Sequence, residues 1–242
     1  MGSGKYGALT GAISRMQVLD NINSNIANAS TPGYKKGVPV FEAKFSEAMA
    51  TRGMHSTNFT TVSAETIDFS QGQMNKSGNP LHLAINGKDF FRIQKEDGEI
   101  VYGRRGNFQR NENNEIVTSA GAKLLGNGDT PVLLPLEEFT ILLDGSIIAD
   151  NKRVGSIPLY TFEDTNLLRR GNDGVFVAPP DAVVTQSPQP EMLQGYMEGS
   201  NVNIMQETAR MVSTMRVFES AQKALSAYDN MDSKLAELGN LQ

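Results

Sequence analysis

Apolar residues recur at intervals of three and four through the C-terminal segment, Ser200 to Gln242. The run from Asn203 to about Leu238 contains neither proline nor glycine, so nothing in it interrupts a helix. Asn203 can serve as the N-cap, and Gln206 stands where a capping box places its amide. At 1.5 Å per residue such a helix would be roughly 50 Å long, several times the average. Its apolar face comprises Ile204, Met211, Met215, Phe218, Ala221, Leu225, Tyr228, Met231, Leu235 and Leu238.

A second amphipathic segment lies at the other end of the chain, over residues 5–29. We expect its helix to stop near Ser30, because Thr31-Pro32-Gly33 is a turn and the residue before proline avoids the helical region. Two long stripes at the two chain ends can pair as a coiled coil. The alternative is a pair of surface helices packed on a central sheet. The stripe comprises Tyr6, Leu9, Ile13, Met16, Leu19, Ile22 and Ile26.

The middle of the chain has a different texture. From Tyr34 to Gln71 the apolar residues follow neither a helical nor a strand period, which predicts extended connecting structure. Only Val38 to Phe45 has the pattern of an ordered segment. After Gln71, short apolar runs alternate with Gly, Asn and Pro, as in an all-β sandwich or barrel of roughly 110 residues. Asp97-Gly98 and Asp144-Gly145 are the two clear hairpin signals.

These patterns predict a nested α+β fold. Residues 1–35 and 200–242 would form a terminal α-helical assembly domain in which the two helices pair in coiled-coil fashion. Residues 36–70 and 181–199 would form an extended connector. Residues 71–180 would form an inserted all-β domain, held outside the helices.

Composition excludes several classes of protein. The chain has 242 residues, 39% of them hydrophobic and 20% charged, with a net charge of −5. Its basic residues are scattered, so we expect no nucleic-acid partner. No apolar run approaches the roughly 20 residues of a membrane span, so none is predicted. The N-terminal residues lack the apolar core of a cleaved secretory signal.

Candidate chemistry is sparse. Cysteine is absent, and the two histidines, His55 and His82, lie far apart with no second ligand at metal spacing. A Gly-x-Ser-x-Gly motif is also absent. We therefore predict no catalytic, cofactor-binding or metal-binding residue, and no enzyme. Two other hypotheses stay open: a β-domain binding module on a helical stalk, and a β-rich hydrolase whose cleft the sequence does not reveal.

Four segments together carry a family resemblance. In order along the chain, they resemble the signatures of the rod and hook family, the axial proteins of the bacterial flagellum. Two departures stand out: His82 replaces the usual Asp, and Gly103 occupies the place of a Thr. The segments are Asn25–Lys35 (NIANASTPGYK), Asn79–Gly87 (NPLHLAING) with Phe90-Phe91, Tyr102–Phe108 (YGRRGNF) and Gly195–Asn203 (GYMEGSNVN).

The resemblance implies a structural role without catalysis or cofactor. Such subunits leave the cell through the flagellar type III export apparatus and assemble with copies of themselves and with neighbouring rod proteins. Their terminal helices surround a central channel and their β domains lie outside. The rod crosses the periplasm in the basal body and transmits torque to the hook. Gly4 to Gly11 looks most like the proximal-rod type; a distal-rod or hook-type axial protein is the alternative.

Assembly would use the helix faces and the two terminal signatures. Phe218 and Leu225 are the expected anchors, and asparagines between Asn21 and Asn28 would either cross-link neighbouring helices or solvate the helix end. Both chain ends are expected to be loose in the monomer and to order on assembly. The candidate interface residues are Leu9, Ile13, Met16, Ile22, Asn25, Ile26, Asn28, Pro32, Gly33, Tyr34, Ser200, Asn201, Val202, Met211, Met215, Phe218, Leu225, Tyr228 and Leu235.

Overall fold

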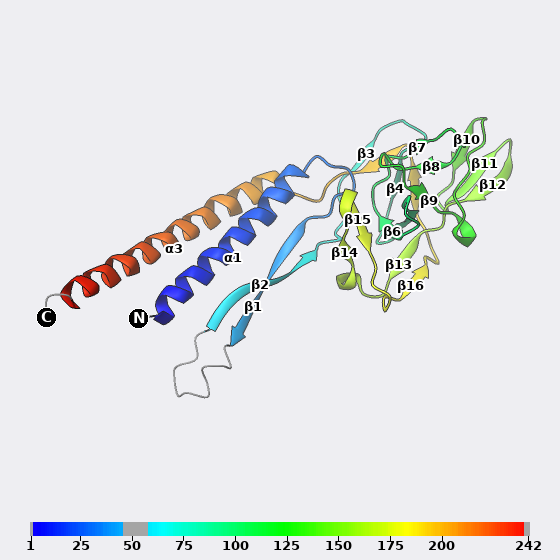
Figure 1. Cartoon of the computed structure of the whole chain (residues 1–242). Coiled ribbons are helices and arrows are strands. Elements are labelled where there is room, and N and C mark those ends of the chain that lie inside the picture. The colour runs from blue at the N-terminus through cyan, green and yellow to red at the C-terminus, as the bar shows by residue number, and fades with distance from the viewer. Residues whose placement is uncertain (1, 46–57, 240–242) are drawn as a thin grey trace. The chain divides into compact units, whose positions relative to one another are not determined.

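The computed structural model of the chain describes residues 2–45 and 58–239 (Figure 1). His55 lies outside these residues, and the side chain of Leu235 is likewise outside the described part. The chain forms two compact units. The first takes the described parts of 1–27, 37–66 and 203–242, and the second takes 28–36 and 67–202. We call them the helical unit and the β unit.

The helical unit is built on two helices, α1 (Gly2–Ala27) and α3 (Ile204–Gly239). They contact each other and run antiparallel, with Lys5 Nζ 2.5 Å from Asp229 Oδ1 (Figure 1). Asn203 Oδ1 accepts a hydrogen bond from the Gln206 backbone N–H at 3.2 Å, which confirms the predicted N-cap. The α+β class and the two terminal helices are therefore confirmed.

Two strands complete the helical unit. β1 (Gly37–Phe45) and β2 (Asn58–Ile67) pair as a two-stranded sheet. β1 contacts α1, and the Arg15 guanidinium lies 5.6 Å from the centre of the Phe41 ring. The stretch expected to be extended connection thus contains regular structure, and β1 includes the segment from Val38 that the sequence marked as ordered.

A seven-stranded antiparallel sheet organises the β unit, in the order β14-β15-β6-β5-β9-β8-β7. Its strands are β5 (Phe91–Gln94), β6 (Ile100–Gly103), β7 (Gln109–Arg110), β8 (Ile116–Val117), β9 (Lys123–Leu124), β14 (Arg169–Arg170) and β15 (Val175–Val177).

The β unit also contains smaller sheets. β10 (Phe139–Ile141), β11 (Ser146–Ala149) and β12 (Lys152–Ser156) form a three-stranded sheet, and β13 (Tyr160–Phe162) pairs with β16 (Val184–Gln186). Short 3₁₀ turns occupy Asn127–Asp129, Thr165–Leu167 and Asn172–Gly174.

Both hairpin predictions are confirmed. Asp97-Gly98 lies between the antiparallel strands β5 and β6, and Asp144-Gly145 lies between β10 and β11. Gly98 and Gly145 have φ of +85° and +79°, the left-handed region that an ordinary side chain avoids. The two Asp-Gly pairs therefore predicted the positions of both turns correctly.

Late segments of the chain close the β unit. β17 (Met192–Gln194) pairs antiparallel with β4 (Leu83–Ile85), and β18 (Tyr196–Glu198) pairs antiparallel with β3 (Met74–Lys76). Residues before α3 are thus part of the β unit's own hydrogen-bonding network, across more than a hundred residues of sequence.

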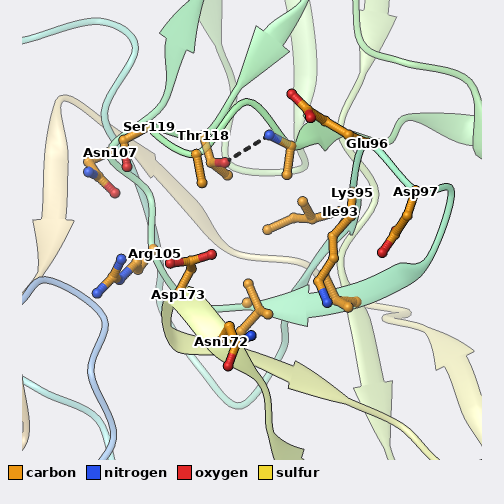
Figure 2. A pocket seen from close by; sticks show the side chains of 15 residues that line it. Ile93, Lys95, Glu96, Asp97, Arg105, Asn107, Thr118, Ser119, Asn172 and Asp173 are labelled. Carbon is orange, nitrogen blue, oxygen red and sulfur yellow. Dashed lines mark hydrogen bonds between the residues drawn. The ribbon is translucent and has the colours of Figure 1, made fainter.

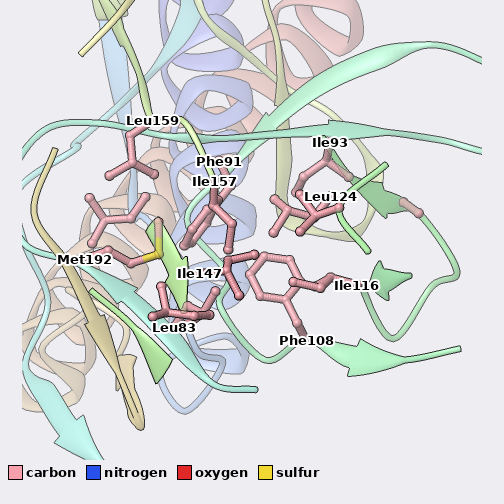
Figure 3. Close-up of a cluster of buried hydrophobic side chains, with 14 of the residues drawn as sticks. Leu83, Phe91, Ile93, Phe108, Ile116, Leu124, Ile147, Ile157, Leu159 and Met192 are labelled. Atoms are coloured by element: carbon pink, nitrogen blue, oxygen red, sulfur yellow. The ribbon is translucent and has the colours of Figure 1, made fainter. Parts of the chain in front are cut away.

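Two apolar clusters fill the β unit. The larger gathers side chains from most of its strands, among them Leu83, Phe91 and Leu124 (Figure 3). Phe91 and Phe108 meet edge to face with ring centres 5.1 Å apart. The smaller cluster is aromatic and centres on Phe90 and Phe176. The β unit therefore has its own core, which the helices do not supply.

Candidate assembly site

An apolar surface runs along α1 on the side away from its buried face. Val18 and Ile22 are buried, whereas Leu9, Ile13 and Met16 are 44%, 50% and 54% exposed. These are large side chains on a helix whose partner α3 covers only one face. Contiguous exposed apolar side chains of this kind mark interaction surfaces.

α3, like α1, carries some apolar residues that are at least partly buried and others that are exposed. Its inward row is partly buried and includes Met211, Phe218, Leu225 and Tyr228, at the spacing of one helix face. Other apolar residues remain in solvent: Ile204, Met205, Val212, Met215, Val217 and Met231 are exposed. A two-helix unit can bury one seam, and both helices carry more apolar surface than that seam uses.

The structure distributes the predicted interface residues over both units. On the helical unit, Leu9, Ile13, Met16 and Met215 are exposed, and Ile26, Met211, Phe218, Leu225 and Tyr228 are half-buried. Ile22 and Asn25 are buried within the same unit, and Gly33 and Tyr34 are buried within the β unit. Asn28, Pro32, Ser200, Asn201 and Val202 are half-buried in the β unit.

Asn25 has a role that the sequence did not suggest. Its side chain is fully buried; its amide donates to Gly37 O at 2.9 Å, and its oxygen accepts from Gly37 N at 2.9 Å. This two-way contact satisfies both backbone groups of Gly37 where β1 begins. Asn25 thereby fixes the path from α1 into β1 within its own chain.

The N-terminal signature docks in the β unit. Gly33 N donates to Glu198 O at 2.8 Å, and Asn201 Oδ1 accepts from Lys36 N at 2.8 Å. Asn201 also donates to Asp68 O at 2.8 Å. Gly33 has φ of +67°, and a Cβ there would lie 2.7 Å from Arg105 N. Residues of the two terminal signatures are therefore bonded to each other, 163 to 165 positions apart.

Three charged side chains lie at the centre of this junction, and all three are fully buried. Lys35 Nζ is 2.6 Å from Glu198 Oε1, and Arg104 Nη1 is 3.2 Å from Glu198 Oε2. Glu198 Oε1 also accepts from Gly72 N at 2.9 Å, and Lys35 donates to Ser70 O at 2.7 Å. We call Lys35, Arg104 and Glu198 the junction cluster.

Two cations share one carboxylate in the junction cluster. Burial lowers the pKa of Lys35 below its ordinary value, and the neighbouring Arg104 charge lowers it further, against the attraction of Glu198. Burial likewise lowers the pKa of Arg104, again opposed by Glu198. Glu198 is thus the single anion of the cluster that compensates both buried cations.

Sequence reasoning quoted these three residues inside three different signatures but did not single them out. A signal was present: Lys35 and Glu198 are each the one charged residue of their signature, and Arg104 is one of two in its own. Their separation prevented the inference, because Lys35 and Glu198 are 163 positions apart. Whether two residues so far apart in the sequence form an ion pair depends on how the strands are connected, and no local sequence pattern indicates it.

Neither helix, over the part of the chain that the structure describes, is long and apolar enough to cross a membrane.

Known families match two parts of the chain. Residues 193–238 match the family described as flagellar basal body rod FlgEFG protein C-terminal. Residues 84–149 match the family described as flagellar hook protein FlgE/F/G D1 domain. The first match covers the end of the β unit and most of α3. The second match covers the central strands of the β unit.

Individual relatives are similar along nearly their full length. The flagellar basal-body rod protein FlgF of Mesorhizobium japonicum is 33% identical over 218 residues, which cover 88% of each chain. The corresponding FlgF of Salmonella typhimurium is 30% identical over 232 residues, 89% of each chain. The rod protein FlgG of Buchnera aphidicola subsp. Schizaphis graminum is 29% identical over 255 residues, 95% of this chain and 96% of its own.

Proposed function

The chain belongs to the family of flagellar basal-body rod proteins, and from this membership we propose that its subunits polymerise in a helical array around a central export channel. It is a structural subunit of the rod and not an enzyme. In the array, the terminal helices pack against those of neighbouring copies, and the assembled shaft transmits torque from the motor to the hook.

One observation carries this proposal: large apolar residues remain exposed on both helices of the helical unit. Leu9, Ile13 and Met16 on α1, and Val212 and Met215 on α3, are between 43% and 54% exposed. Burying apolar surface is favourable by about 25 cal/mol per Å². Helices from adjacent copies would supply the missing cover, in coiled-coil-like packing.

The units would divide the work. Terminal residues 1–35 and 200–242 serve as the assembly domain, and the β-rich part within 71–180 lies outside the shaft, joined by connecting residues 36–70 and 181–199. Asn28, Pro32 to Tyr34 and Ser200 to Val202, which lie in the β unit next in sequence to the two helices, would take part in the contacts with neighbouring copies. The flagellar type III export apparatus delivers the chain to its site of assembly.

The proximal-rod type is the first candidate position within the shaft. It is favoured by the opening segment Gly4 to Gly11 and by relatives named FlgF that are at least 30% identical. The distal-rod type is the second candidate, because the relative named FlgG aligns over 95% of this chain. Complementation of strains that lack one or the other protein separates the two positions.

Charge on the exposed helix faces tests the proposal. Ile13→Asp and Met215→Asp alter side chains that are 50% and 43% exposed, so each subunit should fold normally. We expect both variants to be missing from isolated basal bodies and to leave cells non-motile. Val183→Asp, at an exposed apolar position of the β unit, is the matched control and should assemble. Normal incorporation of both helix variants would contradict the proposal.

A further inference from the structure

The β unit contains a cavity of about 370 Å³ that the junction does not use (Figure 2). Its floor is apolar and is formed by Ile93, Val101, Ala122 and Val175. Its rim is polar and includes Lys95, Arg105, Ser119 and Asp173. An apolar floor with a few polar groups at the mouth is the usual form of a binding pocket.

Gly103 helps to keep this cavity open. It lines the wall, and a Cβ built on it would lie 3.1 Å from Ile93 Cδ1 and 3.9 Å from Val175 Cγ1. A larger side chain at this position would therefore project among the residues of the floor. Gly103 is also one of the two positions where the chain departs from the signature it resembles, which has Thr there.

A polar donor in the wall lacks a partner. Arg105 Nε is buried and has no hydrogen-bond partner among the residues that the structure describes. The guanidinium packs over Gly174, where a Cβ would lie 3.0 Å from Nε. Arg105 also lines the cavity, so its positive charge favours a ligand that carries a carboxylate.

A complementary feature occurs around β10. Leu136, just before this strand, is 82% exposed, and Leu142 and Leu143, just after it, are also exposed. Glu137 follows Leu136 and contacts Asp150; the hydrogen bond to Asp150 and its like charge raise the pKa of Glu137. The segment thus presents an apolar side chain next to a pair of interacting carboxyl groups.

We propose that Leu136 of one copy inserts into this cavity of the next copy, with Glu137 placed against Arg105. The inference rests on the proposed rod function, since it requires neighbouring copies. Leu136 and the cavity are different patches of the β unit, because no residue of β10, β11 or β12 lines the cavity. A contact between different patches on identical subunits is head-to-tail, and when it does not close into a ring it generates a helical filament.

Cysteine cross-linking tests this contact directly, because the chain contains no cysteine. Two differently tagged full-length variants, Leu136→Cys and Ser119→Cys at the cavity rim, are expressed together. Basal bodies are isolated and oxidised, and disulfide-linked dimers carrying both tags are measured on non-reducing gels. Val183→Cys, at an exposed position elsewhere on the β unit, replaces Leu136→Cys in the matched control.

We expect the Leu136→Cys and Ser119→Cys pair to cross-link at least tenfold more than the control pair. Adding Gly103→Thr, which fills the cavity, should reduce the cross-link to the control level while the subunit still enters the basal body. Subunits present in basal bodies without the cross-link would overturn the contact and leave the rod function standing. A cross-link from Ser119→Cys to a different protein, or one that Gly103→Thr leaves unchanged, would also overturn it.

Discussion

Lys35 Nζ lies 2.6 Å from Glu198 Oε1, and neither side chain is accessible to solvent. The contact joins the N-terminal signature to the C-terminal signature inside the β unit. Breaking a buried pair by removing one partner costs about 3–5 kcal/mol, because the other charge is left uncompensated. The junction cluster adds a second cation, Arg104, to the same carboxylate, so its three members are not equivalent.

Removing the anion should therefore be worse than removing one cation. Glu198→Gln leaves Lys35 and Arg104 buried together without the carboxylate that contacts both, and we expect a loss of about 3–5 kcal/mol. Lys35→Met leaves the Arg104–Glu198 pair intact, and we expect a smaller loss. Urea unfolding of the β unit, followed by its aromatic signals, measures both. Equal losses, or a larger loss for Lys35→Met, would refute this order.

The pH dependence of stability follows from the lowered pKa of Lys35. In the unfolded chain this lysine titrates near its ordinary value of about 10.4, so between the folded and the unfolded pKa the unfolded state binds more protons. Stability contributed by this group must then rise with pH through that window. We expect the difference in unfolding free energy between the natural chain and Lys35→Met to grow toward about pH 10. A constant or shrinking difference would show that folding does not lower this pKa.

Gly33 should not tolerate a side chain. An alanine at this position would destabilise the fold for two reasons. The φ of +67° disfavours a Cβ by roughly 1–2 kcal/mol, and the Cβ would lie 2.7 Å from Arg105 N. Gly78→Ala tests the effect of φ alone, since Gly78 has φ of +75° but nothing within 4 Å of a built Cβ. We expect Gly33→Ala to lower the thermal midpoint of the β unit clearly more than Gly78→Ala does. Similar shifts would mean that the junction can move aside.

Phe218 is the expected anchor of assembly on α3. It is half-buried, on the inward row of the helix, so Phe218→Glu places a charge where apolar contact is needed. We expect the variant to be absent from basal bodies while its β unit unfolds at the same urea concentration as the natural chain. Gln222→Glu, an exposed position of the same helix, is the control and should be incorporated. Motility with Phe218→Glu would count against this role.

Hydrogen exchange on dilute monomer should locate the boundary between loose and stable parts. We expect fast exchange in α1 and α3, because isolated helices are marginal in water, and slow exchange in the strands of the β unit. Exchange in residues 28–36 distinguishes the boundary expected from the sequence from the boundary seen in the structure. The sequence placed residues up to 35 with the loose ends, whereas their hydrogen bonds lie in the β unit, so Gly33 and Lys36 amides should be protected. Slow exchange throughout both helices would favour a subunit that closes its own seam.

Local chemistry made much of the fold predictable. The two helices follow from the apolar period and from the Asn203 cap, and the two hairpins follow from Asp-Gly pairs. The junction cluster could not be predicted in this way. Lys35 and Arg104 reach Glu198 across 163 and 94 residues, and only the completed strand pairing brings them together. The same holds for Asn25, whose helical position gives no hint that it bonds to Gly37.

The N-terminal signature is held in place by the last residues before α3. Gly33 and Lys36 bond to Glu198 and Asn201, so residues 198–201 supply part of the site in which residues 28–36 dock. In a chain that folds from an extended state, these bonds can form only after residues 33–36 and 198–201 have come together. A chain that ends before residue 198 would lack them, so its N-terminal signature would be held less firmly. The junction therefore couples the order of the N-terminal signature to that of the segment before α3.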